Sequence, residues 1–156
     1  MKNKNSNIVG RFKEQYGLAG MFLFLLIVVT SYLKADNFFG LVNMYSILTP
    51  NEVQKVIFSI ITFDMVSSAA LALFGGIAIF FFVRLNEKAL VFAFAFLVLQ
   101  PVADAIIEFG YSGQLVRAFL ALVGGALIFW LFWHFLGNKT SNYFKINYGK
   151  FLEYFM

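Results

Sequence analysis

Five ionisable side chains interrupt otherwise apolar stretches of this sequence. They are Asp64, Asp104, Glu108, Arg117 and His134. Ionisable groups inside apolar helices are costly, and each one suggests a functional site unless a partner neutralises it. Three acids and one Arg leave two interpretations open. Either Arg117 pairs with Asp104 or Asp64 and fixes the helix register, or the surplus carboxylates hold a proton, a cation or a basic residue of a partner.

The spacing of these residues places them on the polar faces of three helices. Gln100, Asp104 and Glu108 follow one another at intervals of four, so they share one face. Two other helices carry similar faces of polar and small residues. One face consists of Asp64, Ser68, Ala72 and Gly75, and the other consists of Arg117, Ala121 and Gly124. We therefore expect the three faces to meet in a common interior, with Arg117 in contact with at least one of the three acids. His134 lies beside two Trp residues, which indicates an interfacial aromatic belt.

The composition shows what kind of chain must position these groups. Of 156 residues, 61% are hydrophobic and 13% are charged, whereas a soluble domain has about 25% charged residues. A chain of this length cannot form a core large enough to bury so much apolar surface, which excludes a water-soluble enzyme. With no Cys and a single His, we predict no catalytic residue, no metal site and no cofactor. The net charge of +4 is not gathered on a basic face, which argues against nucleic-acid binding.

Four apolar stretches approach the length of about 20 residues that a membrane-spanning helix needs. They cover residues 17–33, 63–83, 89–107 and 114–136 of one predicted domain, residues 1–156. The predicted class is all-α, an integral membrane bundle of four transmembrane helices. Nine of the twelve Lys and Arg residues fall at the two ends of the chain and in the loop between the second and third spans. By the positive-inside rule, both termini of the chain are expected to be cytoplasmic.

The segments outside the spans are apolar as well. The long connection at residues 34–50 is expected to cover the outer ends of the helices, and residues 51–61 either prolong the second span or lie in the interface before a bend. Both cytoplasmic ends are predicted to be amphipathic, with residues 137–156 interfacial. The aromatic and aliphatic stripes that indicate this are Ile8, Phe12 and Tyr16, and Phe144, Tyr148, Phe151, Leu152 and Phe155. These stripes either anchor the chain at the interface or dock a partner.

Two Gly-Gly pairs occupy matching places in the second and fourth spans. Residues 71–81 and 120–130 share seven identities in eleven at an offset of 49, which fits either a parallel duplication of two hairpins or a chance match between apolar helices. The pairs are Gly75 with Gly76 and Gly124 with Gly125. Glycines let membrane helices approach closely, so we expect all four to lie at close helix contacts. On this reasoning, Gly124→Leu is expected to force two helices apart.

Short motifs at the two ends carry a family resemblance. The first is Tyr16-Gly-Leu-Ala-Gly20, and the second is Trp130-x-Phe-x-His-x-x-Gly-Asn-Lys-Thr-Ser-Asn-Tyr-Phe144. They resemble the ends of a bacterial inner-membrane family of unknown function with four helices, although Met21 stands where that family has Trp. The resemblance implies the same four-span plan, and it supplies no activity because the function of that family is unknown.

These observations favour a protein that works by association. The first hypothesis is a non-catalytic inner-membrane protein that binds a membrane or envelope partner, or a second copy of itself, as an accessory, regulatory or immunity-like subunit. The alternative is a small oligomeric transporter or channel component, with the acids and Arg117 on its pathway. In both cases the lipid bilayer surrounds the chain.

Overall fold

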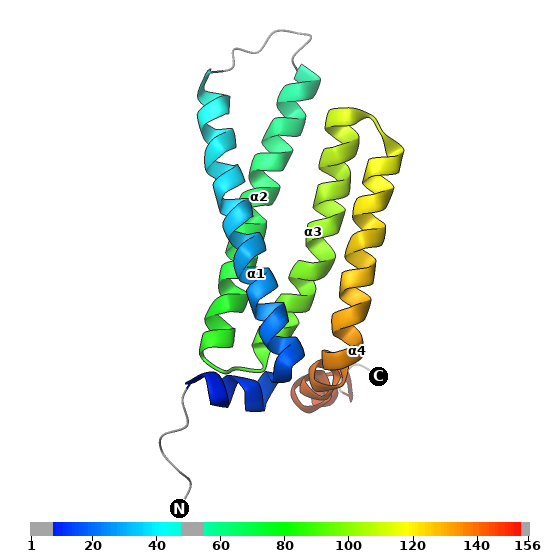
Figure 1. Cartoon of the computed structure of the whole chain (residues 1–156). Helices are drawn as coiled ribbons and strands as arrows, with labels where there is room; N and C mark the ends of the chain where they lie inside the picture. The colour runs from blue at the N-terminus through cyan, green and yellow to red at the C-terminus, as the bar shows by residue number, and fades with distance from the viewer. Residues whose placement is uncertain (1–7, 48–54, 154–156) are drawn as a thin grey trace, which may run out of the picture.

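The fold consists of four long helices in a computed structural model that describes residues 8–47 and 55–153. The helices are α1 (Ile8–Ile47), α2 (Lys55–Val83), α3 (Lys88–Ser112) and α4 (Leu115–Glu153). Each contains a stretch long and apolar enough to cross a membrane: Gly10–Met44, Phe58–Val83, Lys88–Ser112 and Leu115–Thr140. The predicted all-α class and the four long apolar helices are confirmed. Ile8 and Glu153 lie at the same end of the bundle, called here the termini end; the opposite end is the far end (Figure 1).

A sharp bend at Gly17 divides α1 into a short N-terminal helix and a long one. Gly17 has φ 69° and ψ −173°, a backbone conformation open almost only to glycine. The short helix runs across the termini end (Figure 1). There Phe12 and Tyr16 pack on Phe82 of α2, with ring centroids 5.8 and 5.1 Å from the Phe82 ring. Two members of the N-terminal stripe therefore bind the bundle itself.

The connection expected at residues 34–50 is wrong over most of its length, because α1 continues as helix to Ile47. The continuation is stabilised by contacts with the neighbouring helices: Leu41 is buried, and the side chains of Lys34 and Asn37 bind α3 and α2. From Lys55 onward α2 is one helix without a bend, so residues 55–61 prolong it, and residues 51–54 lie outside the described residues. As a result α1 and α2 extend beyond α3 and α4 at the far end (Figure 1).

The helices pack in chain order, α1 on α2, α2 on α3 and α3 on α4, and α1 makes few contacts with α4. Helix α3 lies in the middle and contributes much of the core, including Leu90, Phe94, Phe96 and Leu97. One third of the apolar stretch of α3 is buried, but only 11% of that of α4. Helix α4 is therefore attached to the bundle mainly through α3.

Only two of the four paired glycines lie at close helix contacts. A methyl group at Gly75 would overlap the Ser31 side chain of α1, and one at Gly125 would overlap the Pro101 ring of α3. At Gly76 and Gly124 no other side chain or helix comes within 4 Å of an added methyl group. The expectation that Gly124 marks a tight crossing is therefore wrong, because α4 turns the neighbouring glycine toward α3.

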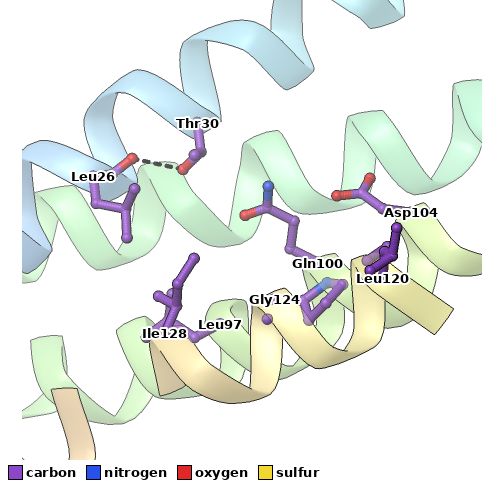
Figure 2. A pocket seen from close by; sticks show the side chains of 11 residues that line it. Leu26, Thr30, Leu97, Gln100, Asp104, Leu120, Gly124 and Ile128 are labelled. Atoms are coloured by element: carbon purple, nitrogen blue, oxygen red, sulfur yellow. Dashed lines mark hydrogen bonds between the residues drawn. The ribbon is translucent and has the colours of Figure 1, made fainter. Parts of the chain in front are cut away.

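The sparse contact between α1 and α4 leaves a groove between them, and α3 forms its floor (Figure 2). This α1–α4 groove has a volume of about 280 Å³. Its lining residues are Leu26 and Thr30 of α1, Leu97, Gln100, Pro101 and Asp104 of α3, and Leu120, Ala121, Gly124, Gly125 and Ile128 of α4. Most of the lining is apolar, and the polar atoms of Gln100 and Asp104 lie toward the far end.

Candidate functional site

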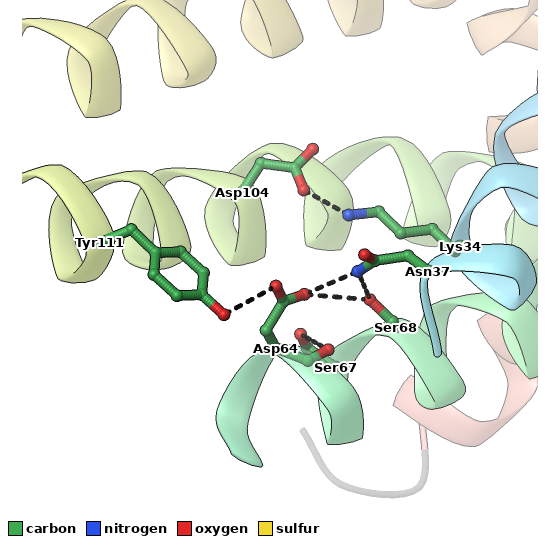
Figure 3. A network of polar contacts seen from close by, with 7 residues as sticks. All are labelled: Lys34, Asn37, Asp64, Ser67, Ser68, Asp104 and Tyr111. Carbon is green, nitrogen blue, oxygen red and sulfur yellow. Dashed lines mark hydrogen bonds and ion pairs between the residues drawn. The ribbon is translucent and has the colours of Figure 1, made fainter. Parts of the chain in front are cut away.

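The polar side chains of the bundle gather toward its far end, where α1 faces α2 and α3 (Figure 3). We call this group the polar cluster; its members are Lys34, Asn37, Asp64, Ser68, Asp104 and Tyr111. Lys34 and Asn37 are three residues apart on α1, so both point from the same side of the helix. One of them binds α3 and the other binds α2, so each contacts a different acid.

The first half of the polar cluster is an ion pair. Lys34 Nζ lies 2.5 Å from Asp104 Oδ1, and the two side chains are 15% and 33% exposed. This geometry is a charge-assisted hydrogen bond from the ammonium group to the carboxylate, which is stronger than a neutral one. This pair joins α1 to α3, and the ammonium group of Lys34 neutralises the charge of Asp104. Both side chains are partly shielded from solvent.

The second half surrounds Asp64, which is only 7% exposed. Its Oδ1 atom accepts hydrogen bonds from Asn37 Nδ2 at 3.0 Å and from Ser68 Oγ at 3.2 Å. Its Oδ2 atom accepts a longer one from the Tyr111 hydroxyl at 3.5 Å, and Asn37 Nδ2 also donates to Ser68 Oγ at 2.9 Å. All of these donors are neutral, so Asp64 is hydrogen-bonded but has no cation beside it among the described residues.

The structure places the predicted site residues in three different settings. Asp64 and Asp104 do meet in one region, as their helix faces indicated. Gln100 lies one turn from Asp104 on the floor of the groove, while Glu108 is exposed. Arg117 is also exposed and makes no ion pair in the described part of the chain.

The expected contact between Arg117 and an acid is therefore wrong, and Lys34 takes its place. The reason is the length of α1, which carries Lys34 into the bundle, while α4 packs on α3 and leaves Arg117 exposed. Sequence reasoning treated Lys34 as a flanking charge and missed Asn37 and Tyr111. The available signal was the spacing of Lys34 and Asn37, which continues the helical phase of the first span.

A second set of polar contacts joins both chain ends to the termini end of the bundle. The Tyr16 hydroxyl donates to the carbonyl of Asn86 at 2.7 Å, and Gln15 Nε2 donates to the carbonyl of Leu85 at 2.5 Å. Lys139 Nζ of α4 donates to the carbonyl of Gln15 at 2.6 Å. Lys139 of the second end motif thus contacts Gln15, the residue that precedes the first end motif, beside the α2–α3 turn.

The remaining candidate, His134, is exposed beside two aromatic rings. Its ring centroid lies 6.0 Å from that of Trp130 and 5.2 Å from that of Phe135. Over residues 8–47 and 55–153, no three His, Asp or Glu side chains come close enough together to hold a metal ion. The contacts that the polar cluster does make are hydrogen bonds and one ion pair.

With both acids ionised, Lys34, Asp64 and Asp104 together carry one negative charge. The contacts of these three residues join α1, α2 and α3 at one level, so the polar cluster sets the register of these helices. No family model matches the chain, and neither a curated protein nor a solved structure matches it.

Proposed function

We propose that the chain is a four-span protein of the bacterial inner membrane, with both termini cytoplasmic, that acts through association and not through catalysis. The four apolar helices support the span count, and the even count agrees with Ile8 and Glu153 lying at one end. Nine of the twelve basic residues belong to the termini end by sequence, which favours the cytoplasm for that side. The partner is a second membrane protein or a second copy of this chain.

The observation that carries the association role is the sparse packing of α4. Membrane helices have no hydrophobic drive to pack, so they associate through close contact and hydrogen bonds. Helix α4 makes such contacts mainly with α3, while the polar cluster joins the other three helices to one another. The outward side of α4 carries large apolar side chains, among them Val116, Phe119, Leu127 and Trp130. A helix packed on one side only gains contact when a partner covers the other side.

Site-specific photo-crosslinking in native membranes tests this role. A photoreactive residue is placed at Phe119 or Leu127 of α4, and matched controls use Val66 and Leu73 of α2, which are 59% and 70% exposed. We expect protein crosslinks at the α4 positions and only lipid adducts at the α2 positions. Equal protein crosslinking at both helices, or none at either together with a monomeric mass in mild detergent, would refute the association role.

One observation favours the second function, a small oligomeric transporter or channel component. Asp64 has hydrogen-bond donors but no neighbouring cation among the described residues, so its carboxylate is available to bind a proton or a transported cation. Proteoliposomes decide between the functions. Transport predicts a proton or cation flux that Asp64→Asn abolishes, and association predicts no flux from the wild-type protein.

A further inference from the structure

The α1–α4 groove is partly open to the surface of the bundle, has a volume of about 280 Å³ and is lined mostly by apolar side chains. The α4 wall is recessed at Gly124, where an added methyl group would have no contact within 4 Å among the described residues. Leu26, Leu97 and Ile128 provide apolar walls toward the termini end. Such a slot suits an acyl chain.

The polarity of the groove changes along its length in the same direction as that of a lipid leaflet. Counting from the start of α3 at about 1.5 Å per residue, Leu97 lies about 14 Å and Asp104 about 24 Å along the helix. In a hydrocarbon core about 30 Å thick, the apolar part is then near the midplane and the polar part near the far surface. Thr30 is already bonded to the Leu26 carbonyl, but the Gln100 amide between α1 and α4 has no partner in the described part of the chain (Figure 2).

Arg117 provides the charge beyond the polar end of the groove. It shares a helix face with Ala121, Gly124 and Ile128, which line the groove, and lies one turn farther toward the far end. Its guanidinium is exposed and forms no ion pair within the described residues, while Asp104, the acid that lines the groove, is bound by Lys34. An unpaired guanidinium at the level of lipid headgroups matches a phosphate, which it can bind through two hydrogen bonds.

We propose that the α1–α4 groove is a binding site for one phospholipid of the leaflet at the far end. One acyl chain lies in the groove over Gly124, the Gln100 amide donates to an ester carbonyl of the lipid, and Arg117 binds the phosphate. The inference rests on the proposed membrane insertion of the chain and adds to that proposal a binding site for one phospholipid.

The experiment uses native mass spectrometry of the full chain, delipidated in detergent and titrated with phosphatidylglycerol. Gly124→Leu fills the groove and should weaken lipid binding by at least about tenfold, because the acyl chain loses its place. Gly76→Leu is the matched control, since Gly76 is equally open but lies on α2 away from the groove. Arg117→Gln should weaken binding by about tenfold, the loss of one charge-assisted contact, and Arg84→Gln at the opposite end should not.

Two further ligands separate the contributions of chain and headgroup. Diacylglycerol, which lacks the phosphate, should bind more weakly than phosphatidylglycerol and should be insensitive to Arg117→Gln. Inorganic phosphate alone should not bind. Equal lipid binding by Gly124→Leu and Gly76→Leu, or equal loss with Arg117→Gln and Arg84→Gln, would overturn the proposal.

The outcomes also distinguish this inference from the proposed function. If the chain is released from membranes by alkaline carbonate, membrane insertion fails and the lipid site fails with it. If the chain stays in the membrane and α4 still crosslinks to a protein, but Gly124→Leu leaves lipid binding unchanged, only the lipid site is refuted.

Discussion

The close helix crossings at Gly75 and Gly125 give the most direct test of the structure by single substitutions. A methyl group at Gly75 would lie 2.8 Å from Ser31 Cβ and 3.3 Å from Phe96 Cε2, and would overlap Ser31 Oγ. One at Gly125 would overlap the ring of Pro101. The Cβ of Ser31 and the ring of Pro101 are fixed to their backbones, so side-chain rotation cannot relieve either clash. Gly75→Ala must move α1 from α2, and Gly125→Ala must move α3 from α4.

The expected change in stability follows from the difference between glycines at close helix contacts and glycines with open space around them. Overpacking a close contact costs about 1–3 kcal/mol. At Gly76 and Gly124 there is nothing to clash with, and Ala is favoured over Gly inside a helix by up to about 1 kcal/mol. Gly75→Ala and Gly125→Ala should therefore be less stable than wild type, and Gly76→Ala and Gly124→Ala equal to it or more stable.

Thermal unfolding of the four variants in one detergent measures this order. A rescue sharpens the test: Ser31→Gly removes both atoms that clash at Gly75, so the double variant Gly75→Ala with Ser31→Gly should recover most of the loss, whereas Ser31→Ala should recover only part of it. If all four single variants unfold at the same temperature, α1 does not approach α2, nor α3 approach α4, as closely as described.

Three other perturbations test the polar contacts and the bend. Lys34→Met should cost about 1–3 kcal/mol in thermal unfolding, since it leaves the partly buried Asp104 unpaired; adding Asp104→Leu should restore most of this, and Arg117→Ala should change nothing. An equal loss with Arg117→Ala would contradict the assignment of Lys34 as the partner. Asp64→Leu should be less stable than Asp64→Asn by about 1–3 kcal/mol, because Asn keeps an oxygen that accepts the hydrogen bonds; equal stability would show that these bonds contribute nothing. Gly17→Ala should cost about 1–3 kcal/mol and release the short N-terminal helix to proteolysis, because φ 69° is strained for Ala; unchanged protease resistance would argue against the bend.

Local patterns predicted the helices and the faces that their polar residues share, but not the partners of those residues. Hydropathy was sufficient to predict four helices. The spacing of polar residues by four was sufficient to predict that Asp64 and Asp104 face one interior. The choice between Lys34 and Arg117 as the cation depended on which helices are neighbours and how far each continues. Residues 34–47 contain charged and amide side chains, which resemble a connection when read alone. They are helical because Lys34 and Asn37 find partners on α3 and α2, and only the tertiary arrangement supplies these partners.

The two matching Gly-Gly segments show how a shift of one residue changes the role of a helix. At the offset of 49, Gly75 corresponds to Gly124 and Gly76 to Gly125. The tight glycine, however, is the first of its pair in α2 and the second in α4. One residue is about 100° of helix rotation, so α4 meets its preceding helix with a different side than α2 does. That rotation leaves Gly124 open to the α1–α4 groove, whereas Gly75 is closed against α1. Two similar sequences thus produce two close crossings, at Gly75 and at Gly125, but only the second pair places its open glycine on the α1–α4 groove.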